Sequence, residues 1–255
     1  MEKILGIAHV TILESFRRKD PFVVVILAGV IVFGAGLFSR FGTEDLGKFV
    51  KDVAFTVTTL MSIVICVITA ARQIPNEISN RTLYPLVAKP VSRFTLFMGK
   101  YVGTSLLASG VVLIFWLELF MLFRILDIPI GAVFFQAVYL RIISMWILAA
   151  MVLGLSTVFT HGANVTICLL LSLAMQTFTN AMVAIRTELE GFGLYIVDAI
   201  YWIVPHLQLF DLSKKEVHNW PAVPLWVLAA LTIYALIYSS FFIVLGSRRF
   251  SKLSL

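Results

Sequence analysis

The sequence carries few side chains that perform chemistry, and those few are scattered. General acid–base or nucleophilic catalysis needs paired acids or a Ser/His couple, but Glu118 has no second acid on neighbouring helical turns. A metal site needs His, Cys or Met at ligand spacing. The four histidines lack such neighbours: His9, His161, His206 and His218. We therefore expect no catalytic residue and no metal on this chain.

ATP hydrolysis is also not expected of this chain. A phosphate-binding loop has the pattern G-x-x-x-x-G-K-[ST]. The one candidate, Gly99-Lys100, has Phe94 where the first glycine should be and Tyr101 after the lysine. The chain itself therefore lacks the loop that would hold ATP and Mg²⁺.

Two charged residues lie within apolar segments, where a lone charge is costly. They are Glu118 and Arg141. If the two segments form adjacent antiparallel helices, these side chains can meet, and we hypothesise an intramembrane ion pair between them. In the alternative, Arg141 marks the outer membrane interface and the span begins only at Ile142.

Composition identifies the environment that must position these residues. The chain has 255 residues, of which 60% are hydrophobic and 13% charged, and its mean hydropathy is +0.98. A soluble domain cannot cover so much apolar surface, whereas lipid can. The net charge of +6 comes from clusters between apolar runs, which favours membrane topology over nucleic-acid binding. Cys66 and Cys168 each lie in an apolar run, so neither a disulfide framework nor a CxxC motif is expected.

Uninterrupted apolar runs predict an all-α, polytopic membrane protein with six transmembrane helices, because only helices satisfy their own backbone hydrogen bonds in lipid. The whole chain, residues 1–255, is read as a single transmembrane domain. The predicted spans are Pro21–Phe38, Val53–Ala71, Tyr101–Phe123, Ile130–Phe159, Val165–Ile185 and Pro224–Gly246.

Basic residues predict the orientation. Lys and Arg are enriched before the first span, between the second and third, and after the last, which places both termini in the cytoplasm. The inner connection between the fourth and fifth spans is then minimal, His161–Asn164. We expect a multi-pass protein of the inner (cytoplasmic) membrane.

Two further helical segments are predicted outside the spans. Residues 1–20 repeat apolar side chains at helical spacing, which indicates an amphipathic interfacial helix, although a simple extension of the first span is the alternative. Within the outer segment 186–223, Phe192–Val204 is too short for a span and carries Asp198. This favours a re-entrant or interfacial helix.

The inner connection Arg72–Lys100 is long and polar, and long loops usually have a function. Pro75 suits the first turn of a helix, Glu77 and Arg81 are spaced for an ion pair, and Pro85 ends or bends the helix. A short charged helix at the membrane face is predicted. The alternative is a solvated connector that only holds topology.

The spacing in this connection resembles the inner loop of ABC transporter permeases of the type 2 export class. In that family an E-x-x-x-R/G-T turn is followed by L-x-x-x-P-x-S-R and then by G-K at the start of the third span. The matching residues here are Glu77, Arg81, Thr82, Leu86, Pro90, Arg93, Gly99 and Lys100. The pattern looks most like the permeases grouped with multicopper enzyme maturation and nitrous oxide reductase assembly.

The resemblance implies that residues 72–100 form a coupling helix that docks on a separate ATP-binding cassette ATPase, through Glu77, Arg81, Thr82, Leu86, Pro90 and Arg93. It further implies a permease subunit, acting as an exporter with a second permease copy, as a homodimer or heterodimer. A membrane scaffold or assembly factor without transport, or an intramembrane enzyme, are the alternative functions.

Overall fold

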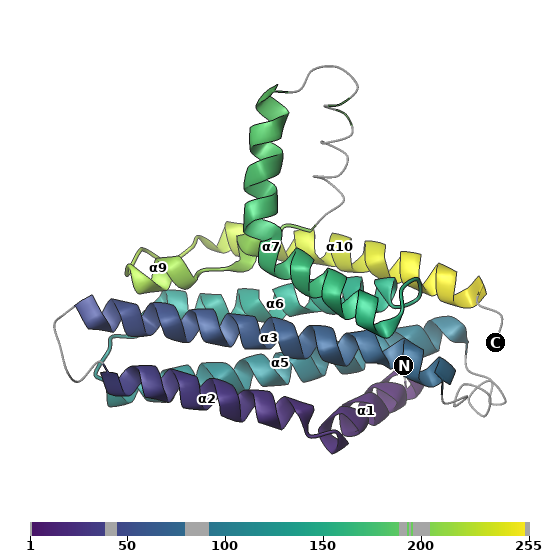
Figure 1. Ribbon diagram of the computed structural model, residues 1–255, viewed down its shortest axis with the longest axis horizontal. Helices are drawn as coiled ribbons and strands as arrows, with labels where there is room; N and C mark the ends of the chain where they lie inside the picture. The colour runs from purple at the N-terminus through teal and green to yellow at the C-terminus, as the bar shows by residue number, and fades with distance from the viewer. Residues whose placement is uncertain are drawn as a thin grey trace.

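The computed structural model describes residues 2–38, 45–79, 92–188, 193, 195 and 205–252, and every regular element among them is helical. Most of the helices lie side by side in one elongated bundle (Figure 1). The elements are α1 (Glu2–Arg17), α2 (Asp20–Phe38), α3 (Asp45–Ser79), α5 (Arg93–Ile125), α6 (Ala132–Leu155), α7 (His161–Glu188), the 3₁₀ helix η2 (Leu207–Phe210), α9 (Ser213–Val217) and α10 (Leu225–Lys252).

All six predicted spans fall on helices, and four of these helices are long and apolar enough to cross a membrane: α3, α5, α6 and α10. The shortest of the four, α6, has 24 residues. At about 1.5 Å per residue it exceeds the roughly 30 Å of a hydrocarbon core. The apolar parts of α2 and α7 are shorter, Pro21–Gly34 and His161–Ala174.

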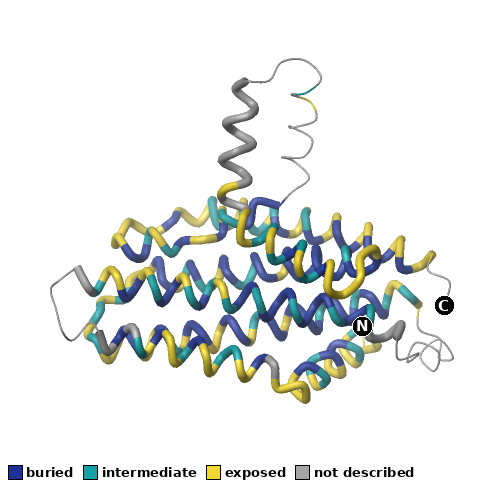
Figure 2. The backbone as a smooth tube through the Cα atoms, viewed as in Figure 1, coloured by how far each residue is buried: buried dark blue, intermediate teal, exposed yellow. Residues whose placement is uncertain are grey.

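Helices α3, α5 and α6 pack against one another in the centre of the bundle. Around them, α2 contacts α3 and α5, α10 contacts α6 and α5, α7 contacts α3, and α1 contacts α5. Every residue from Ile147 to Gly154 of α6 is buried, as expected for a helix surrounded on all sides. Exposed residues follow the outer faces of α2 and α10 (Figure 2), and many are apolar, as contact with lipid requires.

An aromatic cluster holds the three central helices together. Phe55 of α3 contacts Trp116 and Phe123 of α5 and Phe134 of α6, with ring centroids 5.9 to 6.3 Å apart. The rings meet edge to face, the arrangement that their charge distribution favours. All four side chains are buried.

The bundle has two ends, which we name by the short helices there. At the α1 end, α3, α6 and α10 finish, and α5 and α7 begin (Figure 1). At the α9 end, α5 finishes, and α6 and α10 begin. The first residues of α1 and the last residues of α10 lie at the α1 end. Lys19, with φ 60°, separates α1 from α2, so residues 1–20 contain a helix distinct from the first span.

Three predicted features differ from the structure or lie outside it. No separate helix begins at Pro75, because α3 continues through this residue to Ser79 at the loss of one backbone hydrogen bond. The predicted loop His161–Asn164 is instead the first turn of α7, where Asn164 donates a side-chain hydrogen bond to the carbonyl of Val152 at the end of α6. The predicted re-entrant segment Phe192–Val204 lies outside the described residues except for two positions.

Candidate functional site

The predicted coupling segment connects two helices at the α1 end. Helix α3 ends at Ser79 and α5 begins at Arg93, so the segment joins the ends of two of the three central helices. The backbone of Glu77 belongs to the last turns of α3. The other predicted docking residues before α5 lie outside the described residues: Arg81, Thr82, Leu86 and Pro90.

The start of α5 is fixed both locally and to α10. Ser92 caps the helix, because its hydroxyl accepts a hydrogen bond of 3.1 Å from the backbone N–H of Thr95. The Arg93 guanidinium donates from Nη1 to the carbonyls of Phe250 (3.3 Å) and Ser251 (3.0 Å). Arg93 therefore ties the first turn of α5 to the last turns of α10, a contact that its predicted role did not include.

Helix α1 packs on the same part of α5. The ammonium of Lys100 is buried and lies 3.8 Å from the carboxylate of Glu14. Gly99 and Gly103 lie beneath α1, and a Cβ added at Gly103 would lie 2.8 Å from the carbonyl oxygen of Ala8. Small residues four apart allow this close approach of two helix backbones. Helices α1, α3, α5 and α10 thus meet around the ends of the coupling segment.

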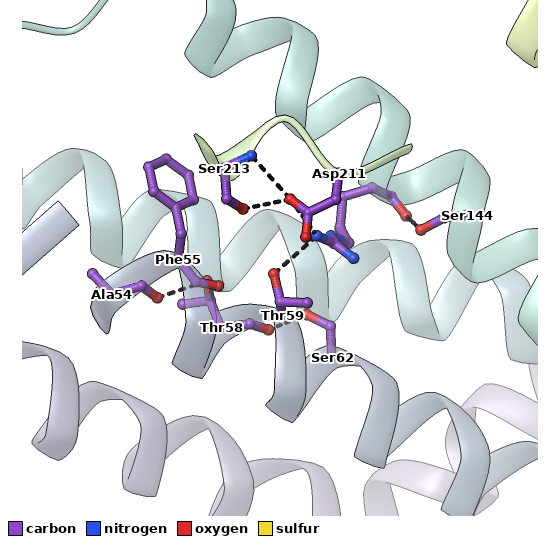
Figure 3. A network of polar contacts seen from close by, with 9 residues as sticks. Ala54, Phe55, Thr58, Thr59, Ser62, Ser144, Asp211 and Ser213 are labelled. Carbon is purple, nitrogen blue, oxygen red and sulfur yellow. Dashed lines mark hydrogen bonds and ion pairs between the residues drawn. The ribbon is translucent and has the colours of Figure 1, made fainter. Parts of the chain in front are cut away.

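The structure does not bring Glu118 and Arg141 together. Arg141 lies on the continuous helix α6, and its Nη2 is 3.3 Å from Asp211 Oδ1 and donates a 2.9 Å hydrogen bond to the hydroxyl of Thr59. Figure 3 shows Thr59 and Asp211 close together, and both contact the Arg141 guanidinium. Arg141 therefore finds its carboxylate in the segment after η2 and not on α5.

Glu118 points to a different helix. A Cβ added at Gly29 of α2 would lie 3.4 Å from Glu118 Oε1, so the carboxyl faces the contact between α5 and α2. Its Oε2 has no hydrogen-bond partner among the residues that the structure describes. The hypothesised ion pair is therefore replaced by an Arg141–Asp211 pair and a carboxyl on the α2 side.

A second buried ion pair at the α9 end was missed by the sequence analysis. The ammonium of Lys51 (α3) lies 3.6 Å from Glu216 Oε1 (α9), and both side chains are almost fully buried. The ammonium also contacts Asn219 Oδ1 at 3.1 Å. The two residues stand far apart in sequence, each beside other charges, and no local spacing signals that they meet.

The carboxyl of Asp211 is adapted to stay ionised. Burial raises its pKa, but the Arg141 charge and hydrogen bonds from the backbone N–H and hydroxyl of Ser213 lower it more, so the pKa lies below its ordinary value. A carboxyl whose pKa is lower in the folded chain stabilises the fold above its unfolded pKa. This stabilisation disappears as pH falls through the folded pKa.

We therefore expect Asp211→Asn to lower the unfolding temperature near neutral pH and to have less effect as the pH falls below about 4, near the ordinary pKa of Asp. Thermal unfolding of both proteins in detergent across this pH range measures the difference. A difference that is constant from neutral to acidic pH would show that the charge of Asp211 contributes nothing.

No group of three His, Cys, Asp or Glu side chains in the described parts of the chain is arranged to hold a metal ion. The buried polar side chains described above instead join helices to one another or to the segment after η2. These contacts fix the positions of the helices relative to one another at the α1 end, at the α9 end and between them.

Comparison with known proteins agrees with this architecture. A family model described as ABC-2 family transporter protein matches residues 16–188, which is more than half of the 255-residue chain. The matched region runs from the end of α1 to the end of α7 and includes the whole coupling segment. No curated protein matches the sequence. The chain belongs to the ABC-2 family of transporter proteins, as a multi-pass membrane permease.

Proposed function

We propose that this permease is an exporter subunit that couples ATP hydrolysis by a separate ATPase subunit to outward movement of a substrate. The observation that carries the proposal is the α1 end of the bundle, where the matched ABC-2 region contains the end of α3 and the start of α5. There the segment between Ser79 and Arg93 joins the central helices α3 and α5, and side-chain contacts tie α5 to α1 and α10.

The proposed coupling is mechanical. Closure of two ATPase subunits on ATP is a rigid-body movement, and it would displace any segment seated in them. Displacement of residues 80–91 would pull on the ends of α3 and α5 together. Because Arg93 holds α10 and Lys100 holds α1, these helices would move as one unit against the rest of the bundle.

The proposal assigns partners and orientation. ATP and Mg²⁺ would be bound by the partner, so the α1 end, with the first residues of α1 and the last residues of α10, would face the cytoplasm from the inner membrane. A second permease copy, identical or homologous, would complete the transporter, since one bundle of this size is too small to enclose a pathway alone.

Glu77→Ala and Arg81→Ala are expected to release the ATPase from the purified complex. Truncating a docking residue at an interface centre costs about 2 kcal/mol or more, roughly thirtyfold in affinity. The permease is co-expressed with the ATPase whose reading frame lies beside its own, and the co-purified ATPase and its turnover are measured.

Arg249→Ala is the matched control, because Arg249 is an exposed residue on α10 near the same end of the bundle. Arg93 is less suitable as a test residue, since its side chain also holds α10 in place. If both Glu77→Ala and Arg81→Ala retained and stimulated the ATPase as the control does, the docking role would be refuted.

A further inference from the structure

A cavity of about 270 Å³ lies between α3, α6, α7 and the segment from η2 to α9. One side is polar and carries both signs of charge, and the other side is apolar. The polar lining residues are Thr59, Arg141, Ser172, Gln208, Asp211 and Lys214. The α1 end of the bundle contributes none of them, so this site is separate from the proposed ATPase contact.

Arg141 lines the cavity and is only 5% exposed. Not all of its N–H donors have a partner within the described part of the fold. Both of its side-chain partners, Asp211 and Thr59, are contacted through Nη2. Its Nε is a buried donor without a hydrogen-bond partner among the described residues. A buried donor or acceptor without a partner is destabilising, and a ligand with matching polar atoms would remove that cost.

The charges of the cavity favour an anion. Asp211 compensates Arg141, and its carboxylate is also occupied by Ser213. Lys214, exposed at the same cavity, adds a second cation and leaves the lining with an excess of one positive charge. The guanidinium fork fits phosphate or carboxylate oxygens, and a lysine supplies a point charge for the same group.

The apolar side of the cavity indicates that the anion carries a hydrocarbon tail. Leu60 and Ile63 of α3 and Leu173 of α7 line it, and Leu173 is 50% exposed on the outside of the bundle. Pockets for whole drug-sized molecules span about 300 to 1,000 Å³. The cavity is smaller than this range and suits a headgroup, with the tail left along the exposed leucines.

We propose that this cavity binds the phosphate group of an anionic phospholipid, held by Arg141 and Lys214, with an acyl chain along Leu60 and Leu173. The α3 residues that line the cavity lie in the middle of that helix's apolar span, so the lipid would reach the cavity from the side, where Leu60 and Leu173 are exposed. Occupancy of the cavity requires no ATPase partner, so the inference goes beyond the proposed transport function and can hold or fail independently of it.

Binding of short-chain phosphatidylglycerol to the full chain purified in detergent tests the proposal. Native mass spectrometry and thermal stabilisation report the bound lipid, with short-chain phosphatidylcholine and inorganic phosphate as the comparison ligands. Lys214→Gln is expected to weaken phosphatidylglycerol binding about fivefold, the typical effect of one lysine near an anionic lipid surface. Lys215→Gln is the matched control, because Lys215 is the adjacent lysine of α9 and does not line the cavity.

Weaker binding in Lys214→Gln alone, with phosphatidylcholine and phosphate binding poorly to the wild type, would support the proposal. Equal losses in both lysine variants would show a nonspecific surface charge and overturn it. Inorganic phosphate binding as tightly as the lipid would assign the cavity to a soluble anion and also overturn it. If Arg141→Met folds, we expect it to bind phosphatidylglycerol more weakly. Binding at the wild-type level would show that the cavity is not the lipid site.

Discussion

Replacing Lys51 by methionine is expected to destabilise the fold by about 3 to 5 kcal/mol, the usual cost of leaving one member of a buried ion pair without its partner. The two side chains of this pair are about 4% and 3% exposed, so water cannot solvate the remaining carboxylate. Lys51 is also the residue through which α3 holds the segment after η2. We therefore expect one of the largest effects of any single substitution at the α9 end.

The contacts of Lys51 explain why its loss matters more than that of an ordinary lysine. Its ammonium lies 3.6 Å from Glu216 Oε1 and hydrogen-bonds to Asn219 and to the carbonyls of Pro129 and Glu216. Glu216 Oε1 accepts no hydrogen bond from the described residues. Without Lys51, that carboxylate loses the cation that the described residues place beside it, and α9 loses this polar contact with α3.

Thermal and denaturant unfolding of purified protein in detergent measures the change. Lys48→Met is the control, because Lys48 is exposed on the preceding turn of α3 and the substitution is the same. The double variant Lys51→Met with Glu216→Leu should recover most of the loss, since an apolar pair of similar size often replaces a buried ion pair without cost. A Lys51→Met variant as stable as Lys48→Met would contradict the assigned role.

The helices were predictable from the sequence because lipid imposes a strong rule on it. An apolar run long enough to cross the membrane must be helical, so all six predicted spans fall on helices and the helix before the first span is separate from it. The residues at which the helices end were less predictable. Hydropathy stops at Ala71 of the second predicted span, whereas α3 continues to Ser79 because polar residues also form helix where the chain leaves the apolar region.

Partner choice among the charges was not predictable from spacing. Glu118 and Arg141 stand on consecutive helices, and a sequence shows only that these could be adjacent. The side of each helix on which a residue lies decides the contact, and it directs Glu118 toward α2 and Arg141 toward α3 and Asp211. Asp211 and Glu216 are brought to the bundle by the fold of residues 205–223, which carries no periodic signal.

Two glycines of α5 carry a signal of close helix packing, and the family resemblance drew on only one of them, Gly99. Gly99 and Gly103 are four residues apart, a spacing that lets two helices approach closely in a membrane. The structure places α1 on this pair. A Cβ added at Gly99 would lie 2.6 Å from the Cβ of Ile7, and one added at Gly103 would lie 2.8 Å from the carbonyl oxygen of Ala8.

Gly103→Ala is therefore expected to displace α1 from α5 and to destabilise the protein by about 1 to 3 kcal/mol, the typical cost of overpacking. The added methyl would meet backbone atoms of Ala8, which cannot move aside as the end of a flexible side chain can. Displacement would also separate Glu14 from Lys100, the ion pair that joins α1 to α5. If coupling depends on this junction, ATPase stimulation should fall with stability.

Gly110→Ala provides the matched control, because it makes the same change on the same helix where an added Cβ has no neighbour within 4 Å. There the substitution should be neutral or should stabilise by about 0.5 to 1 kcal/mol, because alanine loses less backbone freedom in a helix than glycine does. Unfolding in detergent and ATPase turnover of the complex are measured for both variants. A Gly103→Ala protein that matched Gly110→Ala in both assays would mean that α1 is not held against α5 in the working transporter, and the rigid junction on which the proposed coupling depends would be lost with it.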